Sequence, residues 1–335
     1  MSTEKEQSPN EITAVFNITK KDVNKEIGIM NSYEETLRAH PNKYENEPIN
    51  NNEEEIKQCQ ITINNEQIPF SYFHKFEKEG KYSIKYKFPN KLNKTLLMFG
   101  ECKSLTDINL SSFDSSNVTD MRNMFYECHN LTNINLANLN TSNVTNMNSL
   151  FDGCSKLTHL DLSSFDTKNV EDMKNMFYSC CELIDINLSS FDTANVIDMC
   201  NMFYKCGKLK ELNLSNFDTS KVTDMHQMFA YCESLTKINL ASFNTSKVTD
   251  MSSMFDNCLS LKEINLANFN TSNVTSFRAK FYKCVSLTRS DLSGFDTRNI
   301  KDNNEFFGMF GGCRLLKDEN IIAKDKRILN ADIEL

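Results

Sequence analysis

Eight cysteines recur along the chain at a fixed interval of 26 residues, with no insertion between the first and the last. They are Cys102, Cys128, Cys154, Cys180, Cys206, Cys232, Cys258 and Cys284. The same register holds for a leucine column, Leu105, Leu131, Leu157, Leu183, Leu209, Leu235, Leu261 and Leu287. It also holds for a largely aromatic column, Phe113, Leu139, Phe165, Phe191, Phe217, Phe243, Phe269 and Phe295. A period of this length predicts a repeat solenoid, in which each unit packs against its neighbours.

In the first part of each unit, apolar and polar residues alternate. In the unit that starts at Leu131, Ile134 and Leu136 alternate with Asn133 and Asn135. Alternation with a period of two is typical of a strand that buries one face. We therefore expect a short strand in every unit, with the asparagine positions facing outward.

The second part of the unit changes its period. Val144, Met147, Leu150, Phe151 and Cys154 follow one another in steps of three and four residues. This spacing is typical of a helix with one buried face. The pattern predicts a short helix on the outer side of every unit.

One unit buries too few apolar side chains to offset the conformational entropy lost on folding, so the units must stack. Strands in a sheet repeat at about 4.8 Å, whereas helices pack about 8–10 Å apart. The sequence therefore predicts an α/β repeat solenoid that bends into an arc, with a parallel sheet on its inner side and short helices outside.

The unit resembles the BspA-type leucine-rich repeats, in particular the 26-residue version known as the DUF285 family. The motif L-x-x-I-N-L-S-x-F-D-T-S-N-V-T-D-M-x-x-M-F-x-x-C stands almost whole in Leu157–Cys180, Leu209–Cys232 and Leu235–Cys258. The resemblance covers about residues 92–316. It implies a leucine-rich-repeat arc and a role in protein–protein or cell-surface contact.

The regions outside the repeats differ in composition. Four segments rich in β-branched and aromatic residues precede the array, so we expect a β-rich N-terminal cap over residues 12–91 after a disordered tail at residues 1–11. The solenoid, of about eight units, is expected to start with a half unit at residue 92 and to end at residue 316. Residues 317–335 are expected to form a C-terminal cap or tail.

Charge and hydropathy exclude several function classes. The net charge of −8 and the absence of a Lys/Arg stripe argue against nucleic-acid binding. The first residues do not resemble a secretory signal, and no stretch reaches the length of about 18 apolar residues that a membrane span needs. We expect a monomeric cytoplasmic protein, with the cell surface, reached by a non-standard route, as the alternative.

The cysteine column is interpreted as a packing feature. Zinc sites need ligands that converge on one point, whereas this column places one thiol in each unit. The expected structural core includes Cys128, Cys154, Cys180, Cys206, Cys232, Cys258, Leu131, Leu157, Phe165 and Phe191. Cys181 and Cys200 lie outside the pattern. We expect no metal and no cofactor.

No catalytic constellation is visible in the sequence. The five histidines, His40, His74, His129, His159 and His226, form no column and lie in no known catalytic motif. The chain is therefore expected not to be an enzyme.

Two further polar columns have more than one interpretation. An Asp/Asn column, Asp114, Asn140, Asp166, Asp192, Asp218, Asn244, Asn270 and Asp296, could bind calcium or bond to local backbone in turns. We favour turns. A threonine column, Thr141, Thr167, Thr193, Thr219, Thr245, Thr271 and Thr297, raises the less favoured alternative of an ice-binding face.

One outward strand column varies in charge from unit to unit. Its residues are Asp107, Asn133, His159, Asp185, Glu211, Lys237, Glu263 and Arg289. Variation on a fixed scaffold is where a recognition surface is expected, although solvated strand positions would look the same. We therefore expect a non-enzymatic scaffold that binds one or more protein partners on the concave sheet. A surface adhesin or glycan-binding protein is the alternative.

Overall fold

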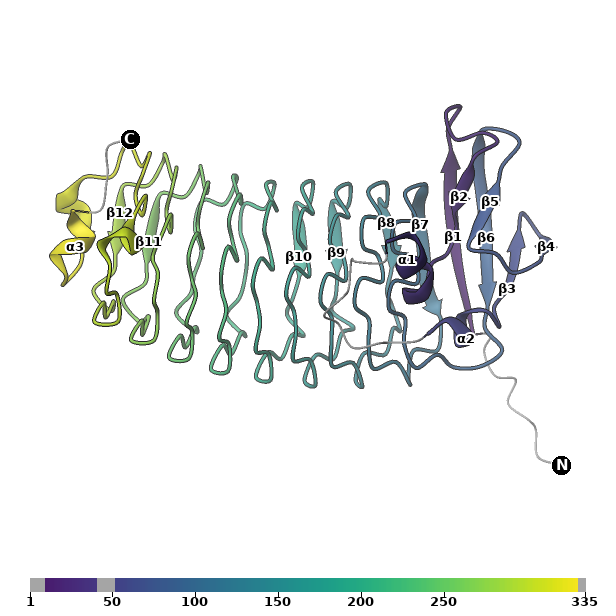
Figure 1. Cartoon of the computed structure of the whole chain (residues 1–335), viewed down its shortest axis with the longest axis horizontal. Helices are drawn as coiled ribbons and strands as arrows, with labels where there is room; N and C mark the ends of the chain where they lie inside the picture. The colour runs from purple at the N-terminus through teal and green to yellow at the C-terminus, as the bar shows by residue number, and fades with distance from the viewer. Residues whose placement is uncertain (1–9, 41–51, 331–335) are drawn as a thin grey trace.

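The computed structural model describes residues 10–40 and 52–330 of the chain. Figure 1 shows an elongated stack of coils, with an antiparallel sheet at the N-terminal end and a short helix at the other end. The expected disordered tail falls almost wholly outside the described residues, as do the last five residues of the expected C-terminal tail.

The N-terminal region is built mainly of antiparallel strands. Their bounds are β1 (Glu11–Ile18), β2 (Glu26–Gly28), β3 (Gln60–Ile63), β4 (Glu66–Ile68), β5 (Phe73–Lys75) and β6 (Gly80–Lys87), with helices α1 (Tyr33–Ala39) and α2 (Glu53–Ile56). Alternate residues of β1 are buried, as the β-branched pattern requires. The predicted β-rich N-terminal sheet is confirmed. It also continues into the repeats, because β1 pairs with the first repeat strand on its far side from β6.

The repeat strands are short and parallel. They are β7 (Leu105–Ser112), β8 (Asn133–Asn135), β9 (His159–Asp161), β10 (Asp185–Asn187), β11 (Glu263–Asn265) and β12 (Arg289–Asp291). Pairs β7–β8, β9–β10 and β11–β12 are in parallel register. The predicted single sheet is nevertheless interrupted, because the coils that contain Glu211 and Lys237 carry no strand. Three residues per coil form too few hydrogen bonds to keep the sheet continuous.

The predicted outer helices are wrong. Residues 92–302 contain no helix, and the expected helical segment is a run of turns. In one coil the amide of Leu150 donates to the oxygen of Met147, and that of Cys154 to Phe151. The third residues of these turns, Ser149 and Gly153, have positive φ values of 53° and 76°, which a right-handed helix excludes. Such turns also point an apolar side chain inward every three or four residues, so they mimic the helical period.

Alternate amides of this turn segment bond to the next coil. They run from Met147 to the oxygen of Asp172 (3.0 Å), from Ser149 to Lys174 (2.9 Å) and from Phe151 to Met176 (3.0 Å). The same pattern recurs along the stack, and the inner phenylalanine rings of successive coils lie 5.4–6.0 Å apart. Because this side repeats far more closely than packed helices would, the predicted cause of an arc is absent.

The core consists of identical side chains stacked from coil to coil. The expected core residues Cys128, Cys154, Cys180, Cys206, Cys232, Cys258, Leu131, Leu157, Phe165 and Phe191 are all at most 3% exposed. From Cys128 onward, each column thiol donates to the phenylalanine oxygen of the preceding coil, at 3.0–3.2 Å. Burial raises the pKa of these thiols, for Cys232 to about 12. The column cysteines are thus neutral packing residues that satisfy a backbone oxygen.

Both ends of the stack are covered by residues that continue its columns. Tyr86 and Phe88 of β6 pack edge-on against Phe99 and Phe113, the first rings of the two aromatic columns. The C-terminal elements are η1 (Asn303–Phe306), η2 (Asp318–Asn320), β13 (Ile321–Ile322) and α3 (Lys326–Leu329). Arg327 there donates to the backbone oxygens of the last coil at 3.0 and 3.1 Å. These contacts replace those of a further coil.

One charged residue lies inside the core. Lys280 occupies the column that holds Met254 in the preceding coil, and its side chain is fully buried. Its Nζ lies 3.5 Å from the oxygen of Met251 and about 6 Å from the ring centres of Phe255 and Phe281. Burial lowers the pKa of Lys280 from 10.5 to about 7. A buried amine with so few partners destabilises the coil.

We predict that Lys280→Met stabilises the protein near neutral pH. Unfolded Lys280 binds a proton below about pH 10.5, but the folded residue stays neutral down to about pH 7. The wild-type stability should therefore fall as the pH drops through this window and level off below it. The variant should gain roughly 2–5 kcal/mol at pH 7 and nearly nothing above pH 10.5.

Urea denaturation between pH 6 and 10 measures this difference. The control is Lys301→Met, which changes an exposed lysine and should leave the unfolding midpoint within experimental error. A gain from Lys280→Met that does not depend on pH would show that the buried amine is not neutral in the folded protein.

Candidate functional site

Two polar columns are occupied with local backbone bonds. In the Asp/Asn column that begins at Asp114, every side-chain oxygen accepts the amide two residues later, at 2.9–3.2 Å. The same bond, at 2.9–3.1 Å, recurs in the strand column Asn109, Asn135, Asp161, Asn187, Asn213, Asn239, Asn265 and Asp291. The predicted turn role of the first column is confirmed, since each residue closes an Asx turn.

The threonine column is not a surface. Its members are at most 7% exposed, and they link successive coils. The hydroxyl of Thr141 donates to the oxygen of Asp166 at 2.9 Å and accepts the amide of Asp166 at 2.8 Å. The ice-binding alternative is therefore wrong, because ice would need these hydroxyls to be exposed.

The variable strand column lies on the surface as the alternation requires. Asn133, His159, Asp185, Glu211, Lys237, Glu263 and Arg289 are exposed, and Asp107 is half-buried next to β1. Because the apolar neighbours in each strand point inward, these residues form one row along the stack, hereafter the strand-face row.

Contacts within the strand-face row are few and polar. The Nδ2 of Asn133 donates to Asp107 at 2.6 Å, and the Nζ of Lys237 lies 3.2 Å from Glu211. Both members of the second pair are about 70% exposed, so this ion pair contributes little to stability. Glu263 and Arg289 are register neighbours in β11 and β12. The row therefore carries charges of both signs that packing does not require.

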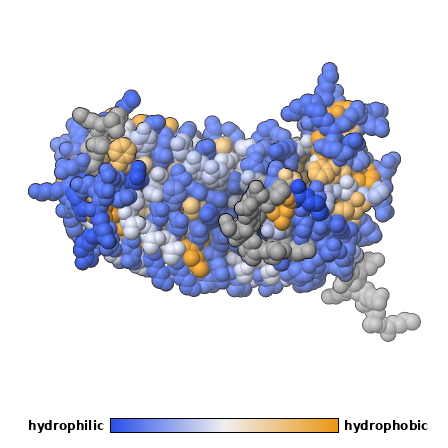
Figure 2. All heavy atoms as spheres, viewed as in Figure 1, coloured by the Kyte–Doolittle hydropathy of each residue, from blue (hydrophilic) through white to orange (hydrophobic). Residues whose placement is uncertain are grey.

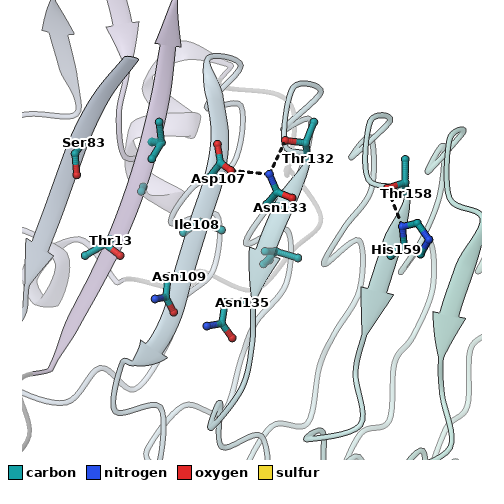
Figure 3. A pocket seen from close by; sticks show the side chains of 13 residues that line it. Thr13, Ser83, Asp107, Ile108, Asn109, Thr132, Asn133, Asn135, Thr158 and His159 are labelled. Atoms are coloured by element: carbon teal, nitrogen blue, oxygen red, sulfur yellow. Dashed lines mark hydrogen bonds between the residues drawn. The ribbon is translucent and has the colours of Figure 1, made fainter. Parts of the chain in front are cut away.

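An open depression of about 440 Å³ lies where the N-terminal sheet meets the first coils. Figure 3 shows Asp107 and Asn133 pointing toward one another on its wall, with Thr13 and Ser83 on the adjoining strands. His159 closes the far side, where its Nδ1 lies 3.0 Å from the hydroxyl of Thr158. Hydroxyl, amide and carboxylate groups offer many hydrogen bonds there.

Sequence analysis missed the part that the N-terminal sheet plays in this depression. Thr13 and Val15 lie on β1 and Ser83 on β6, outside the repeats. Nothing in the repeat pattern indicates that β1 pairs with β7, because antiparallel pairing between distant segments leaves no local signal.

A serine, a histidine and an aspartate meet on the turn side of the stack. The Nδ1 of His226 lies 2.8 Å from the hydroxyl of Ser252 and 3.9 Å from Asp250, and that hydroxyl donates to Asp250 at 2.6 Å. In a catalytic triad the serine and the aspartate use opposite ring nitrogens. Here both face the same nitrogen, so the arrangement does not support nucleophilic catalysis.

A second cluster lies beside this histidine. Ligand atoms of Asp198, Cys200 and Asp224 all lie within 4.8 Å of one another. Burial raises the pKa of Asp198, and the nearby Asp224 adds to this effect. Burial also raises the pKa of Cys200 to about 12. Sequence analysis noted Cys200 as off-pattern but did not connect it with two aspartates 26 residues apart.

Comparison with protein families assigns the repeats. The family model described as "Mycoplasma protein of unknown function, DUF285" matches residues 93–213 and 201–318, which is more than half of the chain. The chain belongs to the DUF285 family. Comparison with curated proteins gives no match. Within the described residues, no helix of this DUF285 protein is long and apolar enough to cross a membrane.

The two outward strand columns should differ in their effect on stability. Asn187 accepts the backbone amide and the hydroxyl of Ser189, whereas Asp185 has no hydrogen-bond partner among the described residues. We predict that Asn187→Ala lowers the free energy of unfolding by about 1–2 kcal/mol, and that Asp185→Ala changes it by less than about 0.5 kcal/mol.

Chemical denaturation of both variants tests this difference. They lie two residues apart on the same strand, so each serves as the control for the other. Equal losses in the two variants would show that the strand-face row is structural.

Proposed function

We propose that this DUF285 protein is a non-enzymatic scaffold of the BspA-like leucine-rich-repeat type that binds a protein partner through the strand-face row. The observation that carries this proposal is that the row is exposed and varies in charge, while the columns beside it are used in packing or Asx turns. A rigid stack presents such residues at a fixed spacing, which favours recognition of an extended surface.

Recognition in this proposal is polar. Figure 2 shows a largely hydrophilic face with scattered apolar spots. The exposed large apolar residues Ile184, Ile197, Phe307 and Leu315 are spread over different coils. A partner would therefore present charges complementary to the row, which determine specificity and association rate more than affinity. We further propose that the scaffold acts as a cytoplasmic monomer.

The test is a triple substitution in the middle of the row. Asp185→Asn, Glu211→Asn and Lys237→Asn each introduce the residue that Asn133 supplies at the equivalent position, so the fold should be retained. Proteins captured by the tagged wild-type chain from its native cell are identified and purified. We predict that the triple variant binds the purified partner at least tenfold more weakly, a loss of about 1.4 kcal/mol or more.

The matched control is the triple variant Lys168→Ser, Lys221→Asn and Lys247→Asn. These lysines are also exposed, lie away from the strand-face row, and change to residues that other coils carry at the same positions. Unchanged affinity in the row variant, or an equal loss in the control, would contradict the assignment of the binding face.

A glycan-binding surface protein is the second candidate, and the depression favours it. Its wall of hydroxyl, amide and carboxylate groups suits a ligand with many hydroxyls. In this case a glycan array should show saccharide binding by the wild-type chain. Asn133→Ala should lose that binding, while Glu263→Ala, outside the depression, should keep it.

Cell fractionation separates the two candidates. Tagged protein that external protease degrades on intact cells supports a surface protein and contradicts the cytoplasmic scaffold. Complete protection, together with no binding on the array, contradicts the glycan-binding candidate.

A further inference from the structure

A row of aspartates runs along the turn side of the stack. Asp172, Asp198, Asp224 and Asp250 occupy the same position in four successive coils, and their backbones are joined by parallel bridges. Carboxylates repeated at this spacing repel one another. The residue two places later offsets this in other coils, because Arg122 pairs with Asp120 at 2.9 Å and Ser252 donates to Asp250 at 2.6 Å.

Cys200 is the exception in this arrangement. It holds the position of Arg122 and Ser252, yet it brings a thiol between two carboxylates, within 4.8 Å of Asp198 and of Asp224. Its side chain is only 5% exposed, and its Sγ has no hydrogen-bond partner among the described residues. The thiols of the cysteine column, in contrast, each donate to a backbone oxygen. A buried thiol directed at two acids is therefore not explained by packing.

We propose that Asp198, Cys200 and Asp224 form a binding site for a divalent transition-metal ion of the zinc class. Thiolate and carboxylate are both zinc ligands, with distances of about 2.3 Å to sulfur and about 2.0–2.2 Å to oxygen. Ligands in such a site lie about 3.5 Å apart, so side-chain rotations that close the cluster by about 1 Å are sufficient. The ion would replace the thiol proton and neutralise the adjacent carboxylates.

The chemistry of the donor set selects the kind of metal. Calcium and magnesium prefer oxygen ligands alone, whereas a thiolate favours zinc or cobalt. Lys174, which precedes Cys200 in the same column, is the nearest opposing charge, and one lysine offsets only part of the four-aspartate row. Water completes the coordination, because the Nδ1 of His226 faces Ser252.

The test uses the full chain, reduced and stripped of metal, with Co²⁺ as a spectroscopic probe and Zn²⁺ as competitor. We expect one equivalent of Co²⁺ to bind with a thiolate-to-cobalt charge-transfer band, and Zn²⁺ to displace it. Cys200→Ser should abolish the band and weaken Zn²⁺ binding at least tenfold. Asp198→Asn should weaken it at least tenfold too. Ser252 and Asn146 occupy the equivalent positions in other coils, so both variants should fold.

Two controls change the same residue types elsewhere. Cys181→Ser removes a half-buried thiol next to the cysteine column, and Asp166→Asn matches Asn140 of the preceding coil in the Asx-turn column. Both should bind cobalt as the wild type does. A charge-transfer band that persists in Cys200→Ser, displacement by equimolar Ca²⁺ or Mg²⁺, or no cobalt binding by the wild type would overturn the proposal.

Discussion

The structure depends on the backbone hydrogen bonds that join one coil to the next on the turn side. They form an almost unbroken series from Thr95 to Lys283, whereas the strand side is divided into separate short sheets. Each bond requires a donor and an acceptor at the same place in successive coils, so the coil length of 26 residues is strongly constrained. The three extra residues near the C-terminus fit because they precede the last turn segment, where the bonds resume at Phe277 and Glu305.

This spacing determines what each side chain can do. Coils held at a distance typical of strands bring identical residues into contact, so phenylalanine rings stack and cysteine thiols reach the preceding coil. Polar columns can repeat only where each member is satisfied locally, as in the Asx turns, or by the next coil, as in the threonine column. The row of aspartates satisfies neither condition fully, since carboxylates meet carboxylates there.

The repeat, the inward leucines and the Asx turns could be predicted from the sequence because each depends on local pattern. The turn segment could not, because turns closed by a bond to the third residue and a helix both place apolar residues at Met147, Leu150 and Phe151. Side-by-side pairing of β1 and β7 was also hidden, since it joins segments about 90 residues apart. The cluster around Cys200 was accessible in principle, because residues two and 26 positions apart must be neighbours in a stack of this period.

A regular stack makes departures from its pattern informative. Any residue that replaces the usual one in a column loses the contacts that its equivalents make, so its persistence calls for another physical reason. Lys280 finds none among its neighbours and is expected only to destabilise its coil. Cys200 differs, because its neighbours are groups that bind the same class of ion as a thiolate does. The strand-face row differs again, since its variation costs no packing and leaves its charges available to a partner.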